Sequence, residues 1–196
     1  MLDILKLLTA ILCIILIQMQ RSENATVYFV LGGPGAGKGS ACIAAAEAGL
    51  AVHLSAGDLL RAERNSGSVN GELIQKHIRE GTIVPASVTI ALLRTAMQNA
   101  GWNEKIFLID GFPRNTENYY AWKEMCTDVD AKFLLHFVCP DEICIERILG
   151  RDEGRVDDNI EAAKRRIEVY KTETMVVINE FEAEGKVRVI QAEKSI

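Results

Sequence analysis

The sequence predicts an α/β protein in which a parallel sheet carries helices on both faces. Short runs of β-branched and aromatic residues alternate with helical patterns along the 196 residues, as in folds where each crossover between parallel strands is a helix. A glycine-rich turn also lies between the first predicted strand and the first predicted helix. No linker divides the chain, so we expect one domain over residues 25–196, preceded by an apolar segment over residues 1–24.

Five segments are predicted as strands because they are short, apolar and rich in β-branched or aromatic residues. They are residues 27–31, 52–54, 106–109, 133–138 and 187–190. The run IFLI at 106–109 has no polar alternation, which is typical of a strand buried on both faces.

Helices are predicted between these strands from apolar periodicity and end signals. An alanine-rich helix covers about 38–48, and Asp58 is predicted to cap a second helix that runs to Gly81. Pro85 opens a third helix, which Gly101 ends, and helices continue from about 141 to 185.

The composition excludes several classes of function. Hydrophobic residues make up 48% and charged residues 25% of the chain, and the net charge of −5 leaves no global basic field that would recruit nucleic acid. The five cysteines form no CxxC pair and no cluster with the three histidines. This argues against a zinc site and against a disulfide framework, and favours reduced thiols inside a cell.

The amino terminus is unusually apolar. Residues 2–17 contain few polar groups, but the uninterrupted apolar stretch from 7 to 17 is shorter than the roughly 17–25 residues that a membrane span requires. No small-residue cleavage signal follows it. Four alternatives stay open: a helix packed on the domain, a doubtful start codon, a membrane anchor formed by residues 2–19, and secretion. The default expectation is a cytoplasmic protein.

Residues 32–40, with the sequence GGPGAGKGS, predict a phosphate-binding loop. Glycines adopt backbone angles closed to other residues, so several N–H groups can point at one polyphosphate beside a helix N-terminus. The expected ligands of the nucleotide are Gly35, Ala36, Gly37, Lys38, Gly39 and Ser40, with Lys38 on the β- and γ-phosphates. Gly39 stands where such loops usually place a magnesium-binding Ser or Thr. We therefore expect Mg²⁺ to be held through phosphate oxygens and water, with no protein ligand. No guanine-reading motif is present, which argues against a signalling GTPase.

The loop and three further motifs together resemble the adenylate kinase family, and within it the UMP-CMP kinases. The further motifs are SAGDLLR at 55–61, LIDGFPRN at 108–115 and GRVDDN at 154–159. The resemblance covers about 27–194. It implies a five-stranded parallel sheet in the order 2-3-1-4-5, an arm for the nucleoside monophosphate at about 55–85, a lid at about 147–160, and a monomer.

The resemblance also implies which charged residues act. Arg61 and Arg114 match the arginines on the acceptor phosphate, and Arg151, Arg155 and Arg166 match the phosphate clamp. Arg147 and Lys194 match positions near the bound ATP, and Asp110 matches the carboxylate that holds a magnesium-bound water. Arg166 lies in the basic run 164–166, and such runs usually face water, so its role follows from the resemblance alone.

Two positions favour a pyrimidine as the acceptor base. Ala56 stands where adenylate kinases usually have a Thr that faces adenine, and Asn118 stands where they carry a Gln. Sites that hydrogen-bond a substrate edge discriminate strongly between bases. The other expected acceptor contacts are Gly57, Gly111, and the backbone of Thr82, Ile83 and Val84.

The sequence thus predicts an ATP-dependent kinase that phosphorylates UMP or CMP, and dCMP as a further candidate. An adenylate kinase acting on AMP is one alternative, and a membrane-tethered nucleotide-binding protein with little turnover is another. The second alternative rests on the apolar N-terminus, on a lid about two residues shorter than in the family, and on the lack, after Ile196, of the final helix that the family usually adds.

Overall fold

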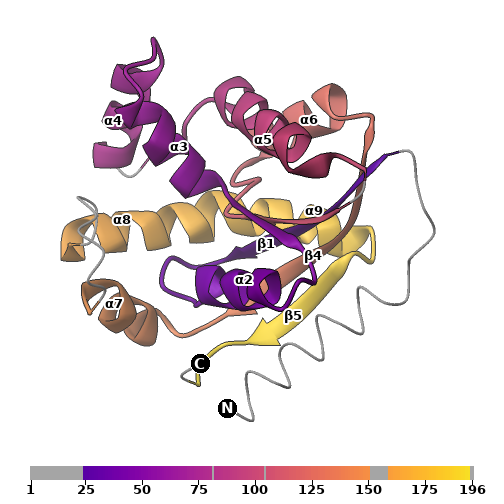
Figure 1. Ribbon diagram of the computed structural model, residues 1–196. Helices are drawn as coiled ribbons and strands as arrows, with labels where there is room; N and C mark the ends of the chain where they lie inside the picture. Colours follow the sequence, from indigo (N-terminus) through magenta and orange to yellow (C-terminus); the bar gives the residue numbers. More distant parts are fainter. Residues whose placement is uncertain (1–23, 81, 104, 151–158, 195–196) are drawn as a thin grey trace.

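The computed structural model describes residues 24–80, 82–103, 105–150 and 159–194. Its centre is a five-stranded parallel sheet in the order β2-β3-β1-β4-β5, which confirms the predicted topology (Figure 1). The strands are β1 (Ala25–Gly32), β2 (Val52–Ser55), β3 (Ile106–Asp110), β4 (Val129–Val138) and β5 (Val187–Gln191).

Helices cover both faces of the sheet, as predicted (Figure 1). They are α2 (Lys38–Glu47), α3 (Ala56–Asn65), α4 (Gly71–Glu80), α5 (Ala86–Gly101), α6 (Thr116–Met125), α7 (Asp141–Leu149), α8 (Ile160–Val169) and α9 (Met175–Ala183). A π-helical turn, η1 (Tyr170–Thr174), joins α8 to α9.

The central strand β1 explains the two-sided core. Val27 and Phe29 point to one face, where they pack with residues of α5, α6 and α9. Tyr28 and Val30 point to the other face, where they pack with residues of α2. Because successive strand residues point to opposite faces, a strand that is apolar throughout must be covered on both sides.

The arm formed by α3 and α4 has a small core of its own. Leu60 of α3 and Ile74 of α4 pack with Val84, which lies just before α5. In Figure 1 the two helices project from the body of the molecule, above α8. The segment predicted as the acceptor arm, about 55–85, thus forms a pair of helices that follows the carboxyl end of β2 and packs on the start of α5.

Two predictions about this arm are wrong. Asp58 does not cap its first helix: the Ser55 side chain accepts the Asp58 N–H at 3.1 Å, so the helix begins at Ala56. A serine hydroxyl that binds the third backbone N–H is a common N-cap, and Asp58 lies in the first turn. The expected continuous helix is two helices, because the chain turns between them at Gly67, whose φ is 77°.

The sequence prediction also passed over α6 (Thr116–Met125), which the Asn115 side chain caps by accepting the Asn118 N–H at 2.9 Å. Within the described ranges no helix has the length and apolar character needed to cross a membrane. The apolar segment 2–19 and the central part of the predicted lid, 151–158, lie outside those ranges.

Candidate functional site

The glycine-rich loop has the backbone geometry of a phosphate site. It leads from β1 into α2, and Gly35 and Gly37 have φ of 84° and 86°, in the left-handed region that favours glycine. A Cβ added at Gly35 would lie 2.3 Å from the carbonyl oxygen of Cys144, so no side chain fits there. The loop therefore brings its backbone to the N-terminus of α2, where N–H groups and the helix dipole favour an anion.

Lys38 lies across this loop. Its Nζ donates to the carbonyl oxygens of Gly32 at 3.0 Å and Gly33 at 2.8 Å. Burial lowers the pKa of Lys38, while the nearby Asp110 carboxylate opposes that shift. A lysine held in this way by two neutral carbonyls can exchange them for a phosphate, which is a stronger, charged acceptor.

Asp110 ends β3 beside the same loop. Oδ2 of Asp110 lies 3.6 Å from Nε2 of His53 on β2. A Cβ added at Gly39 of the loop would lie 3.7 Å from the same oxygen. Within the described residues no group of three acidic, Cys or His side chains could hold a metal. A single, largely buried carboxylate at the phosphate loop fits a Mg²⁺ ion that is held by phosphate oxygens and water, with the carboxylate bonded to one of those waters.

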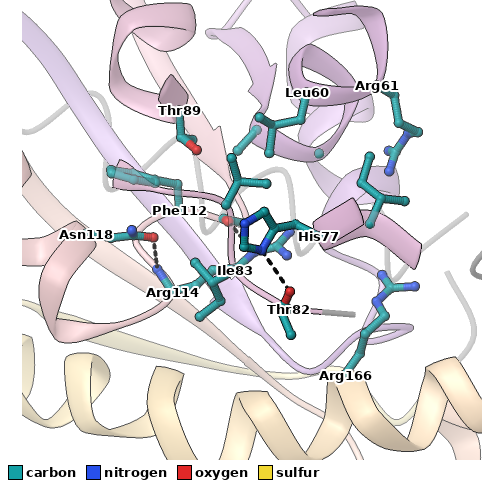
Figure 2. Close-up of a pocket in the computed structure, with 15 residues that line it drawn as sticks. Leu60, Arg61, His77, Thr82, Ile83, Thr89, Phe112, Arg114, Asn118 and Arg166 are labelled. Atoms are coloured by element: carbon teal, nitrogen blue, oxygen red, sulfur yellow. Dashed lines mark hydrogen bonds between the residues drawn. The ribbon is translucent and has the colours of Figure 1, made fainter. Parts of the chain in front are cut away.

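Two adjoining pockets open between the arm, the loop and α8. The first is lined by residues of α3, α4 and α6 and by the segment before α5, as Figure 2 shows. The second is bounded by the phosphate loop, including Gly32 and Lys38, and by η1. Ile83, Gly111, Arg114 and Arg166 line both pockets. The pockets therefore meet at two guanidinium groups.

Arg114 is held firmly at this meeting point. Its Nε donates to the carbonyl oxygen of Gly111 at 2.7 Å, and its backbone N–H donates to Oδ1 of Asn118 at 3.2 Å. Gly111 has a φ of 77°, and the peptide bond between Phe112 and Pro113 is cis. These contacts point the Arg114 side chain back towards the glycine turn that both pockets share.

Arg61 and Arg166 approach the first pocket from opposite sides (Figure 2). Arg61 on α3 forms an ion pair with Asp58 one turn earlier. Arg166 on α8 is partly buried and lines both pockets, whereas its neighbours in the basic run, Lys164 and Arg165, are exposed. Together with Arg114, Arg61 and Arg166 bring three arginines to one hollow, and such a cluster suits a phosphate group.

Asn118 offers a single unused donor inside the first pocket. Its side chain is 2% exposed. Oδ1 accepts the Arg114 N–H, which fixes the amide orientation, and Nδ2 is buried without a hydrogen-bond partner in the described chain. The same pocket is lined by the residues predicted to contact the acceptor: Ala56, Gly57, Thr82, Ile83 and Val84. Because a buried polar atom without a partner is costly, this nitrogen is a candidate donor to an acceptor atom of a ligand.

Comparison with protein-family models matches residues 30–186 to the adenylate kinase family. The chain belongs to the adenylate kinase family. UMP-CMP kinase 3 from Arabidopsis thaliana is 54% identical over 174 residues, which cover 89% of this chain and 85% of that protein. UMP-CMP kinase 2 from Caenorhabditis elegans is 49% identical over 172 residues (87% and 90%). Human UMP-CMP kinase is 50% identical over 177 residues (87% and 90%).

In this adenylate kinase family member the two pockets have the arrangement that a donor and an acceptor nucleotide require. The phosphate loop lies in one pocket and the arm lines the other. Of the arginines expected from the sequence, Arg114, predicted on the acceptor phosphate, and Arg166, predicted in the phosphate clamp, lie where the pockets meet. Arg151 and Arg155 lie outside the described residues.

Arg147 has a different environment from the other predicted arginines. Its guanidinium donates to the carbonyl oxygens of Ala192 at 2.9 Å, Glu193 at 3.2 Å and Lys194 at 3.1 Å. Arg147 and Lys194 are thus brought together, but neither lines the two pockets of the described chain. Their contact with ATP stays a prediction.

Sequence reasoning missed several residues of the site. His77 and Thr89 line the first pocket, and His77 Nδ1 lies 2.8 Å from Oγ1 of Thr82 (Figure 2). Tyr170 and Thr174 of η1 line the second pocket. The residues 170–178 (YKTETMVVI) give no local sign of a π-helical turn, and only the packing of η1 against the loops brings its side chains to the site.

Proposed function

We propose that this protein transfers the γ-phosphoryl group of ATP to UMP or CMP, which gives ADP and UDP or CDP. The observation that carries the proposal is the pair of adjoining pockets that share Arg114 and Arg166. Phosphoryl transfer needs two polyanions held in line and their charge neutralised, more than it needs covalent chemistry. Relatives about half identical to this chain are named UMP-CMP kinases, which supports the same acceptors here.

ATP would bind with its phosphates on the loop. In the proposed step Lys38 releases the carbonyls of Gly32 and Gly33 and turns to the β- and γ-phosphates. Gly35, Ala36, Gly37, Gly39 and Ser40 supply the backbone and the first turn of α2, as expected from the sequence. Mg²⁺, which kinases of this class generally use with ATP, would neutralise the phosphate charge, and Asp110 would hold a water of that ion.

The acceptor phosphate would lie among the three arginines of the first pocket. Arg61 reaches it from the arm, Arg166 from α8, and Arg114 from the turn between the pockets. The acceptor oxygen is already an oxyanion, so the step needs no general base. Each cation aimed at charge that develops in the transition state is commonly worth about 10²–10³ in rate.

The pyrimidine preference rests on Asn118 and Ala56. Because Arg114 occupies the Asn118 oxygen, the amide presents only a donor to the base. Uracil and cytosine both carry ring or carbonyl acceptors, so one donor serves either base. Adenine also has acceptors, so the Asn118 donor alone does not select against AMP. The choice of pyrimidines over AMP is supported by the relatives that are named UMP-CMP kinases.

Several finer assignments belong to the same proposal. We infer that Arg151 and Arg155 complete the clamp, that Arg147 and Lys194 lie near the ATP base, and that the protein works as a monomer in the cytoplasm. The apolar segment 2–19 would pack on the domain or attach it to a membrane.

A coupled assay of ADP formation tests the proposal. Purified protein is supplied with ATP and Mg²⁺ and with AMP, UMP, CMP or dCMP as the acceptor. Turnover with UMP or CMP at least tenfold above that with AMP is the expected result. Preference for AMP would establish an adenylate kinase, and ATP binding without turnover on any acceptor would establish a nucleotide-binding protein.

A further inference from the structure

The turn that connects α8 to α9 is π-helical, which is rare in proteins and often marks a functional site. In η1 the N–H of Met175 bonds to the carbonyl oxygen of Tyr170, five residues earlier. The turn follows the helix that carries Arg166 and precedes the helix that packs on β4 and β5. In the chain, η1 therefore connects α8, which carries Arg166, to α9, which is packed on the sheet.

One end of η1 holds the loop that carries Arg114. The hydroxyl of Thr174 donates to the carbonyl oxygen of Arg114 at 2.8 Å, across 60 residues of sequence. Thr174 is only 5% exposed, so water does not readily replace this hydrogen bond. With the bonds to Gly111 and Asn118, three separate contacts hold Arg114 where the pockets meet.

The other end of η1 touches the phosphate loop. A Cβ added at Gly33 would lie 3.8 Å from the ring of Tyr170, so that ring lies directly against the loop. The Tyr170 hydroxyl lies 2.8 Å from Nε2 of the buried His136 on β4, which anchors the ring to the sheet. One turn thus contacts the donor loop through Tyr170 and the acceptor arginine through Thr174.

We propose that η1 is a positioning element for phosphoryl transfer and that Thr174 is a positioning residue, which acts through Arg114. By bonding to the Arg114 carbonyl, Thr174 sets the distance between the guanidinium and the phosphate loop that Tyr170 contacts. In-line transfer is sensitive to such distances, because a displacement of about 1 Å can cost on the order of 10²-fold in rate. This inference rests on the proposed function.

The test replaces Thr174 by Val, which has nearly the same shape but no hydroxyl. The variant leaves a buried carbonyl without its donor, and we expect kcat/KM for UMP, at saturating ATP, to fall about tenfold or more. Thr174→Ser restores the hydroxyl and should return the value to within about threefold of wild type. Thr172→Val is the matched control, because the exposed Thr172 hydroxyl donates only to the Glu168 carbonyl one turn earlier, and it should leave the value unchanged.

A double-mutant cycle separates positioning from loss of stability. In the Arg114→Ala background Thr174→Val should change kcat/KM by less than about twofold, since the group that it positions is gone. An undiminished tenfold loss in that background, or wild-type kinetics for Thr174→Val alone, would overturn the inference. Calorimetric titration with UMP measures acceptor binding without turnover, so it tests the positioning role of Thr174 separately from the proposed kinase function. If the wild type lacks turnover, the proposed function fails, and unchanged UMP binding by Thr174→Val would then contradict the positioning role.

Discussion

Replacing Asn118 by Asp tests whether its amide nitrogen reads the acceptor base. Asp has the same shape and keeps an oxygen for the Arg114 N–H, but it places a second oxygen where Nδ2 stands. Nδ2 is buried and unpaired, so the substitution removes one donor and puts an acceptor against the acceptor atom of the base. The variant should therefore lose recognition of the base while keeping the position of Arg114.

The size of the effect follows from these contacts. Losing one hydrogen bond costs about 1 kcal/mol, and a buried polar group left unpaired or opposed costs about 1–3 kcal/mol more. A total of about 2–4 kcal/mol corresponds to a fall of roughly 30- to 1,000-fold in kcat/KM for UMP and CMP. KM for ATP should stay within about twofold, because Asn118 lines only the acceptor pocket of the described pair.

The control is the same substitution at Asn115, three residues earlier. Its side chain caps α6 by accepting the Asn118 N–H, and Asp caps helices as well as Asn does. Asn115→Asp adds the same charge near the site and should retain near wild-type kcat/KM in the coupled assay. Wild-type kinetics for Asn118→Asp would refute the assigned role of Nδ2. A parallel rise in KM for ATP would show that the residue acts through Arg114 instead.

Three further predictions concern the loop, the pH dependence of stability and the amino terminus. Lys38→Met should lower kcat at least about a hundredfold in the same assay with the melting temperature retained, and a loss below about tenfold would contradict its phosphate role. A hydrogen bond from Lys123 is the main cause that lowers the pKa of Glu184 from an ordinary 4.5 to about 2. The ionised Glu184 carboxylate therefore stabilises the folded protein above about pH 4.5, and this stabilisation is lost as the pH falls towards 2. Thermal unfolding of Glu184→Gln should be less sensitive to pH across that window, and an unchanged dependence would contradict the assignment. Val189 on the edge strand β5 is 58% exposed, and the apolar segment at the amino terminus would cover such surface if it packs on the domain. Deleting residues 1–20 should then lower the melting temperature and the solubility of the protein. Unchanged values would argue that the segment is a separate anchor.

The sequence by itself determined the positions of the five strands along the chain and the chemistry of the phosphate loop. Both depend on short stretches of chain: the run 106–109 is too short for a helix and rich in β-branched and aromatic residues, and the left-handed turns at Gly35 and Gly37 use glycines placed between a strand and a helix. The strand order came from the resemblance of four motifs to a family, and the structure confirms it.

Only the tertiary structure decided which side chains work together. The basic run 164–166 holds three cations, and the packing of α8 on the core turns Arg166 into both pockets. The hydrogen bond between Thr174 and Arg114 joins residues 60 positions apart, and the Arg114 N–H fixes the orientation of the Asn118 amide, whose nitrogen has no partner in the described chain. Such contacts depend on how elements that are distant in the sequence pack together, so no local pattern of residues predicts them.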